Sequence, residues 1–280
     1  MIYFIAAGTG AVQRTVQDKE REIISVYDFL TTAQKDAVIN DDYSTVTRAQ
    51  ITTAINNCLT AATGAVWWPP GTYRVTTITH PDKVIFHRGS GREETIIQGT
   101  SAAVMNMAYG TGLSQGTTFQ DMAIRGDGAV SSEGTNIALD IDNVGTNLVR
   151  VQCTHAGTGI AARSLIGSNW HSVLAYGEDY GFRGLPSAAP HGGTESLMYE
   201  CAVYYITCST KDGNTGTGTG FKVDGSFEFA GNTFVNLSSE YVGNGIVLDG
   251  DDANDTGNTF IQPWVERVNP AGKAYDDNMP

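Results

Sequence analysis

The pattern of apolar and polar positions changes near residue 65. Before residue 65, Ile51 is followed by apolar residues three, four, seven and eight positions later: Ala54, Ile55, Cys58 and Leu59. This spacing places them on one face of a helix, so a helix is predicted over 47–59, within a helical region at 31–64. After residue 65 the apolar runs are short and end in turn residues, as in Pro-Pro-Gly-Thr at 69–72, which predicts strands.

An internal repeat organises the strand region. Gly231–Glu240 and Gly257–Glu266 share Gly, Asn, Thr, Phe and a final Glu at an offset of 26 residues. Weaker copies begin upstream at Gly116, Gly145, Gly167 and Thr194. A second marker, a glycine before an apolar residue, follows at Gly159-Ile160, Gly181-Phe182, Gly220-Phe221 and Gly245-Ile246. Two strand markers in every 22 to 26 residues are typical of a solenoid of stacked strands.

We therefore predict an all-β fold, a right-handed parallel β-helix over 65–268, capped at its N-terminal end by the helix. Residues 1–30 would form a connecting neck and 269–280 a C-terminal tail. A leucine-rich repeat lacks support because its regular leucine spacing is absent, and a β-sandwich would not keep a constant offset between markers. In this fold Phe234 and Phe260 should stack in adjacent rungs.

Stacked rungs turn the repeat into columns of side chains about 4.8 Å apart. Counting from Thr233, the position three residues later is polar or amphipathic throughout and is expected to face outwards: Asp121, Arg150, Ser172, Tyr199, Asn236 and Gln262. The position seven residues later is mostly polar: Arg125, Thr154, Tyr176, Val203, Glu240 and Glu266. Such a surface suits a glycan, which binds through polar side chains and aromatic rings. The candidate sugar-binding residues are Arg150, Tyr176, Tyr199, Asn236 and Trp264.

Hydrolysis of a glycosidic bond requires two carboxyl groups, about 5–5.5 Å apart when the product retains its configuration. Glu240 and Glu266 are the first candidates, because the repeat places them in one column, one rung apart. Like charges at that distance disfavour each other's ionisation, so one would act as acid and the other as nucleophile. The next candidates are Asp121, Asp127 and Glu178. The competing interpretation is that these carboxylates are ordinary surface groups or contact another subunit.

A lyase would instead pair a base with a cation that neutralises a uronate, as Asp121 and Arg150 would do. No metal or cofactor is predicted. The five histidines show no metal-ligand spacing, and the segment 249–255 lacks the calcium-loop spacing, so it is interpreted as an acidic turn.

The composition narrows the possible partners. The net charge of −13 argues against nucleic acid, and it would repel an acidic polysaccharide unless a local basic or neutral groove compensates. The four cysteines form no C-x-x-C pair, so buried free thiols are expected. No apolar run is long enough to span a membrane, and the first residues lack the basic start of a signal peptide.

Three segments carry a family resemblance. Ala6–Phe29 resembles the segment leading into the β-helix of bacteriophage tailspike and tail-fibre proteins. Gly64–Val75 resembles the first strand pair of their pectate-lyase-like β-helix domain, and Phe260–Glu266 resembles a rung common in these spikes. The resemblance implies a homotrimer in the virion tail that is assembled in the host cytoplasm, contacts other phage tail proteins and acts at the bacterial surface.

The resemblance to tailspike proteins further implies recognition of a capsule or lipopolysaccharide glycan. Two classes of function stay open at this point. One is a depolymerase, with an endo-glycosidase favoured over a polysaccharide lyase. The other is a non-enzymatic receptor-binding or structural tail-fibre component.

Overall fold

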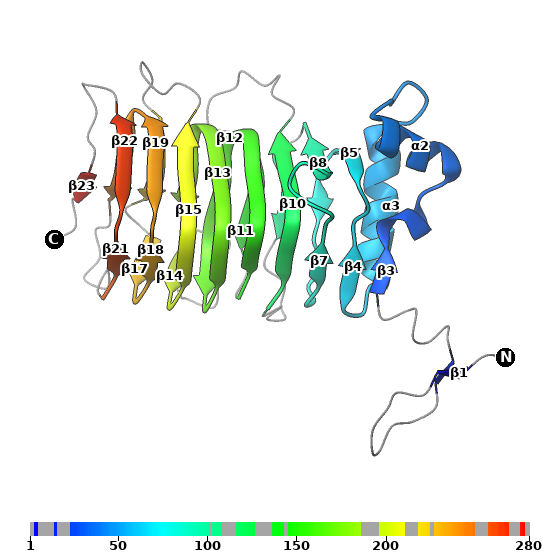
Figure 1. The fold of residues 1–280 in the computed structure, drawn as a ribbon, viewed down its shortest axis with the longest axis horizontal. Coiled ribbons are helices and arrows are strands. Elements are labelled where there is room, and N and C mark those ends of the chain that lie inside the picture. Colours follow the sequence, from blue (N-terminus) through cyan, green and yellow to red (C-terminus); the bar gives the residue numbers. More distant parts are fainter. Residues whose placement is uncertain are drawn as a thin grey trace.

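A single ladder of parallel strands dominates the computed structural model of the chain (Figure 1). The structure describes residues 3–4, 14–15, 23–100, 102–107, 116–126, 136–142, 145–185, 196–210, 218–224, 227–249, 257–268 and 275–277. The first two strands, β1 (Tyr3–Phe4) and β2 (Arg14–Thr15), pair with each other in antiparallel orientation. The other 21 strands form the ladder, and their pairs are parallel. The predicted parallel β-helix is confirmed, and its right-handed winding stays a prediction.

Each turn of the chain adds one strand to each of three stacked sheets. The first sheet contains β3 (Ile23–Ser25), β4 (Ala65–Trp67), β7 (Phe86–Arg88), β18 (Thr233–Val235) and β21 (Thr259–Ile261). The second contains β5 (Gly71–Val75), β8 (Thr95–Gly99), β19 (Ser238–Val242) and β22 (Trp264–Val268). The third contains β6 (Ile78–Thr79), β9 (Ala103–Met107), β11 (Ile137–Asp142), β16 (Thr219–Val223), β20 (Asn244–Leu248) and β23 (Tyr275–Asp277).

Four longer strands bend around a corner and serve more than one sheet. They are β10 (Thr118–Gly126), β12 (Asn147–Ile166), β13 (Asn169–Gly184) and β15 (Ala202–Thr210). Two further strands, β14 (Ser196–Tyr199) and β17 (Phe227–Ala230), continue the ladder from the last residues of β12.

Helices close the N-terminal end of the solenoid (Figure 1). They are a short 3-10 helix, η1 (Val26–Phe29), and the α-helices α2 (Thr32–Asn40) and α3 (Arg48–Ala61). The helix predicted at 47–59 is confirmed as α3. Thr47 begins it with a reciprocal capping box, because its hydroxyl accepts from the Gln50 N–H while the Gln50 side chain accepts from the Thr47 N–H. Ile51 and Ile55 are fully buried in the same apolar cluster as the first strands of the solenoid.

Aligned aromatic side chains fill the interior. Phe234 and Phe260 are register partners, and their rings stack with centroids 5.1 Å apart, as predicted. Phe182 and Phe221 stack at 4.6 Å in the third sheet. A fully buried Phe contributes about 1.5–3 kcal/mol through removal of its surface from water. The solenoid therefore gains stability from each rung that adds a ring to a stack.

Residues with positive φ precede six of the strands in the first sheet. Five are glycines with φ between 61° and 93°: Gly116, Gly145, Gly167, Gly231 and Gly257. The sixth is Glu200, with φ 52°. Glycine suits this position because it has no Cβ to clash with the backbone.

This column corrects one part of the sequence alignment. The fourth copy of the repeat starts at Glu200 and not at Thr194, because Ala202 pairs with Thr233. Tyr199 and Val203 therefore do not occupy the columns predicted for them. Val203 is a fully buried core residue.

The cysteines and the helices were also the subject of predictions from composition. All four cysteines are buried, and none of them forms a disulfide bond, as predicted. None of the described helices has the length and apolar run needed to cross a bilayer.

Candidate functional site

The corner between the first and second sheets is a column of outward side chains. Every member has φ between 52° and 57°: Asp121, Arg150, Ser172, Tyr205, Asn236 and Gln262. In each of these six rungs, a single left-handed residue turns the chain from one sheet into the next and points its side chain away from the core. The predicted outward column is confirmed at five positions, and Tyr205 takes the place predicted for Tyr199. The structure does not describe the Tyr199 side chain.

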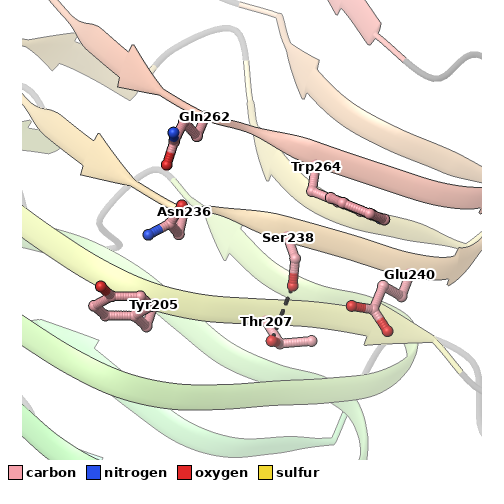
Figure 2. Close-up of a pocket in the computed structure, with 7 residues that line it drawn as sticks. All are labelled: Tyr205, Thr207, Asn236, Ser238, Glu240, Gln262 and Trp264. Atoms are coloured by element: carbon pink, nitrogen blue, oxygen red, sulfur yellow. Dashed lines mark hydrogen bonds between the residues drawn. The ribbon is translucent and has the colours of Figure 1, made fainter.

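A groove lies beside this corner on the last three rungs of the second sheet (Figure 2). It has a volume of about 500 Å³. The lining residues are Tyr205, Thr207, Asn236, Ser238, Glu240, Gln262 and Trp264. They form an ordered array, because Thr207 pairs with Ser238 and Ser238 pairs with Trp264 in the strand register.

Two aromatic side chains in the groove are unusually exposed. Trp264 is 60% exposed and Tyr205 is 55% exposed. Large apolar side chains normally contribute to a core or an interface, so two of them in one hollow mark a surface that gains from being covered. Between them the floor is polar, and the Ser238 hydroxyl donates to the Thr207 hydroxyl at 2.9 Å (Figure 2).

Glu240 and Glu266 are register partners on adjacent rungs, which places them as the repeat predicted. The Ser209 hydroxyl donates to the Glu240 backbone carbonyl at 2.7 Å, which helps to hold that strand in place. Trp264 Nε1 donates to Glu266 Oε2 at 3.3 Å. Among the described residues, the Glu240 carboxylate has neither a hydrogen bond nor an ion pair, and it faces the groove.

Asp121 and Arg150 are in contact, as the register of β10 and β12 requires, but they neutralise each other. Arg150 Nε and Nη2 both donate to the Asp121 carboxylate, one to each oxygen. These hydrogen bonds hold the pKa of Asp121 below its usual value, so this carboxylate is a weak base. The same contact occupies the guanidinium that a lyase would need for a uronate.

The other predicted residues lie around the groove without lining it. Tyr176 is half-buried and pairs with Ser209. Ser209 in turn pairs with Glu240, so Tyr176 lies two rungs away from Glu240. Glu178 is half-buried and follows Gly177 on β13, beyond the second sheet. Asp127 and residues 250–255 of the acidic turn lie outside the described residues.

Sequence reasoning missed Tyr205, Thr207 and Ser238 as site residues. The signal for Tyr205 was present in the apolar pattern. Val203 and Ile206 match Phe234 and Leu237 in spacing, and all four side chains are buried. Aligning these core positions would have placed Tyr205 beside Asn236.

A second hollow, of about 520 Å³, continues the same face towards the N-terminal rungs. Its lining residues are Gly91, Arg92, Glu93, Glu94, Gln152 and Leu174. Leu174 pairs directly with Thr207 of the groove, so the two hollows follow one column of side chains. At this upper end Arg125 Nη2 contacts Glu93 at 2.9 Å.

Comparison with known proteins gives structural similarities. No protein-family model matches the chain, and no curated protein matches it. ORF18 of Geobacillus virus E2 is similar at a TM-score of 0.42 and 14% identity, over 94% of this chain and 68% of that one. A pectin methylesterase from carrot is similar at 0.42 and 11%, over 92% and 85%. Tailspike protein 3 of bacteriophage CBA120 is similar at 0.35 and 12%, over 99% and 64%. The fold assignment rests on the strand pairing of the chain itself.

Proposed function

We propose that the chain is a phage tailspike component that recognises a bacterial surface polysaccharide, capsule or lipopolysaccharide, through the groove on its second sheet. The observation that carries the proposal is the pair of exposed aromatic side chains, Tyr205 and Trp264, beside a polar floor. The resemblance of residues 6–29 and 64–75 to tailspike segments supports the phage context.

The groove offers what a sugar needs for binding. Aromatic rings cover the apolar faces of sugar rings, and amide, hydroxyl and carboxylate groups bond to their hydroxyls. Asn236, Gln262 and Glu240 supply these polar groups on neighbouring rungs. Because the second hollow extends the same face, a polymer would lie along the solenoid axis and contact several rungs.

Glycoside hydrolysis is a second candidate function, favoured by the direct pairing of Glu240 with Glu266. Adjacent rungs bring two carboxylates to about the spacing of a retaining enzyme. In that reaction one carboxylic acid protonates the leaving oxygen while the other carboxylate attacks the anomeric carbon. Water then releases the product with its configuration retained. A lyase based on Asp121 and Arg150 is disfavoured, because the two groups already bind each other.

The wider setting is also part of the proposal. We expect a homotrimer, located in the virion tail and in contact with other tail proteins, as the resemblance implies. The alternative is a non-enzymatic fibre component, which would bind its receptor through the same groove without cleaving it, or would only support other tail parts.

One experiment separates these functions. The protein is incubated with host capsule or lipopolysaccharide, and both co-sedimentation and new reducing ends are measured. Recognition predicts co-sedimentation that Trp264→Ala abolishes, and hydrolysis predicts new reducing ends that fall about 100-fold or more in Glu240→Gln and Glu266→Gln. Binding with no new ends would support the receptor-binding alternative, and the absence of any binding would contradict the proposal.

A further inference from the structure

The charges along the glycan-binding face are unevenly distributed. In its upper part, the guanidinium groups of Arg150 and Arg125 each contact a carboxylate, on Asp121 and Glu93 respectively. Arg92 lines the upper hollow together with Glu93 and Glu94. Two of the described cations on this part of the face are therefore bound to carboxylates, and Arg92 shares its hollow with two more acidic residues.

The lower groove carries negative charge alone. None of its seven lining residues is Lys, Arg or His. Glu240 faces the hollow with no partner among the described residues, and Glu266 lies one rung below it. An anionic sugar placed here would meet the Glu240 carboxylate and no Lys, Arg or His among the lining residues, in a hollow that partly excludes the water that screens charge.

Anionic groups on a ligand would have to be desolvated without a compensating partner, which costs free energy. Hydroxyl and amide donors, in contrast, match the acceptors that the groove presents. The aromatic side chains Tyr205 and Trp264 favour the apolar ring faces of sugars whatever their charge. The charge distribution therefore decides the class of ligand.

We infer that the groove binds glycan segments whose sugars carry no carboxylate, phosphate or sulfate group. This inference rests on the proposed function, because it names the class of polysaccharide that the same groove takes. It also accounts for how a chain with a net charge of −13 binds a polymer: the polymer that it selects is uncharged in the bound segment.

The test uses an array of bacterial surface oligosaccharides, half of which carry an acidic group in every repeat. Wild-type protein is expected to bind uncharged members, with affinities that change little between low and high ionic strength. Trp264→Ala should abolish this binding. The double substitution Glu240→Gln and Glu266→Gln should raise the affinity for acidic members relative to uncharged ones by about tenfold.

A matched control removes two negative charges elsewhere. Asp36 lies on α2 and Asp249 follows β20 of the third sheet, and both are exposed. Asp36→Asn with Asp249→Asn should leave the preference unchanged, which distinguishes the groove from net charge.

The two claims fail in different ways. Acidic oligosaccharides bound by the wild type and released by Trp264→Ala would overturn the inference and leave the proposed function standing. Binding to no array member, or binding that Trp264→Ala leaves intact, would overturn the proposed function itself.

Discussion

Single left-handed residues shape the corners of this solenoid, and their identities differ between columns. At the start of the first-sheet strands, five of the six are glycine and the sixth is Glu200. A residue with a Cβ pays roughly 1–2 kcal/mol in this conformation. Glu200 is exposed, and its backbone N–H donates to the Ala230 carbonyl at 3.3 Å. The strain at this position is therefore not relieved by burial of its side chain.

Replacing this residue by glycine should stabilise the protein. We expect Glu200→Gly to raise the free energy of unfolding by about 0.5–1 kcal/mol. This value is the strain that is relieved, minus the cost of the greater conformational entropy that glycine has in the unfolded chain. Urea denaturation measures the change. Glu200→Gln removes the charge and keeps the strain, so it should leave stability unaltered. A destabilised glycine variant would contradict this explanation of the column.

A pair of buried histidines makes stability depend on pH. Trp68 Nε1 donates to His87 Nδ1 at 3.2 Å, so the His87 proton is on Nε2, which lies 3.0 Å from His80 Nε2. Burial lowers the pKa of His80 to about 4 and the pKa of His87 well below its usual value. Both rings are therefore neutral in the folded protein at neutral pH.

The sign of the effect follows from proton uptake. Between about pH 6.5 and pH 4 the unfolded chain binds protons that the folded chain does not, so stability is complete above pH 6.5 and falls as the pH drops. From pH 7 to pH 5 we expect a loss of about 2 kcal/mol for each histidine, measured by denaturant unfolding. The control variant His171→Gln, which replaces an exposed histidine, should lose as much stability between the two pH values as the wild type. Equal stability at both pH values would contradict the neutral pair.

At the scale of the element, a buried asparagine joins neighbouring turns at the entry to the first sheet. Asn232 is fully buried; its Oδ1 accepts from the Cys201 N–H at 3.0 Å, and its Nδ2 donates to the Met198 carbonyl at 2.8 Å. The same Nδ2 donates to Asn258 Oδ1 at 3.0 Å. These bonds pair the buried side chain with backbone groups on both sides of the turn after β14.

Loss of this side chain should be costly. Asn232→Ala removes the hydrogen bonds that this side chain makes with the Cys201 N–H and the Met198 carbonyl in a fully buried place, so we expect about 2–4 kcal/mol of destabilisation in thermal or urea unfolding. Asn169→Ala is the control, because Asn169 is exposed and the equivalent residue in the next rung is already Ala202. It should change stability by less than about 0.5 kcal/mol. Similar destabilisation of both variants would show that the buried hydrogen bonds of Asn232 are not the cause of the loss in stability.

The elements also show what the sequence predicts and what it leaves open. The Thr47 cap and the Phe234–Phe260 stack were predictable, because each depends on local spacing or on a strong repeat. The groove was only partly predictable. Glu240 and Trp264 sit in the two best copies of the repeat, whereas Tyr205 sits in the copy whose glycine is replaced by Glu200. Without that glycine, the gapless alignment slipped by six residues.

At the scale of the whole molecule, association of three chains is the expectation that follows from the tailspike resemblance. Exposed Trp264 and Ile261 lie on the last described rungs of the solenoid and would contribute to such contacts or to ligand binding. Light scattering at micromolar concentration should give about three times the chain mass of 29.8 kDa. A mass equal to one chain would contradict the trimer and leave the groove of a single chain as the complete binding site.

Recognition of a glycan by this protein depends most on where the glycan binds. The direct measurement is a crystal structure of the protein with an oligosaccharide from the polysaccharide that it co-sediments with. We predict sugar rings against Tyr205 and Trp264, with hydroxyl groups within hydrogen-bonding distance of Glu240. An oligosaccharide bound elsewhere, for example at Tyr180, Arg183 and Lys222 on the third-sheet side, with the groove empty, would contradict it.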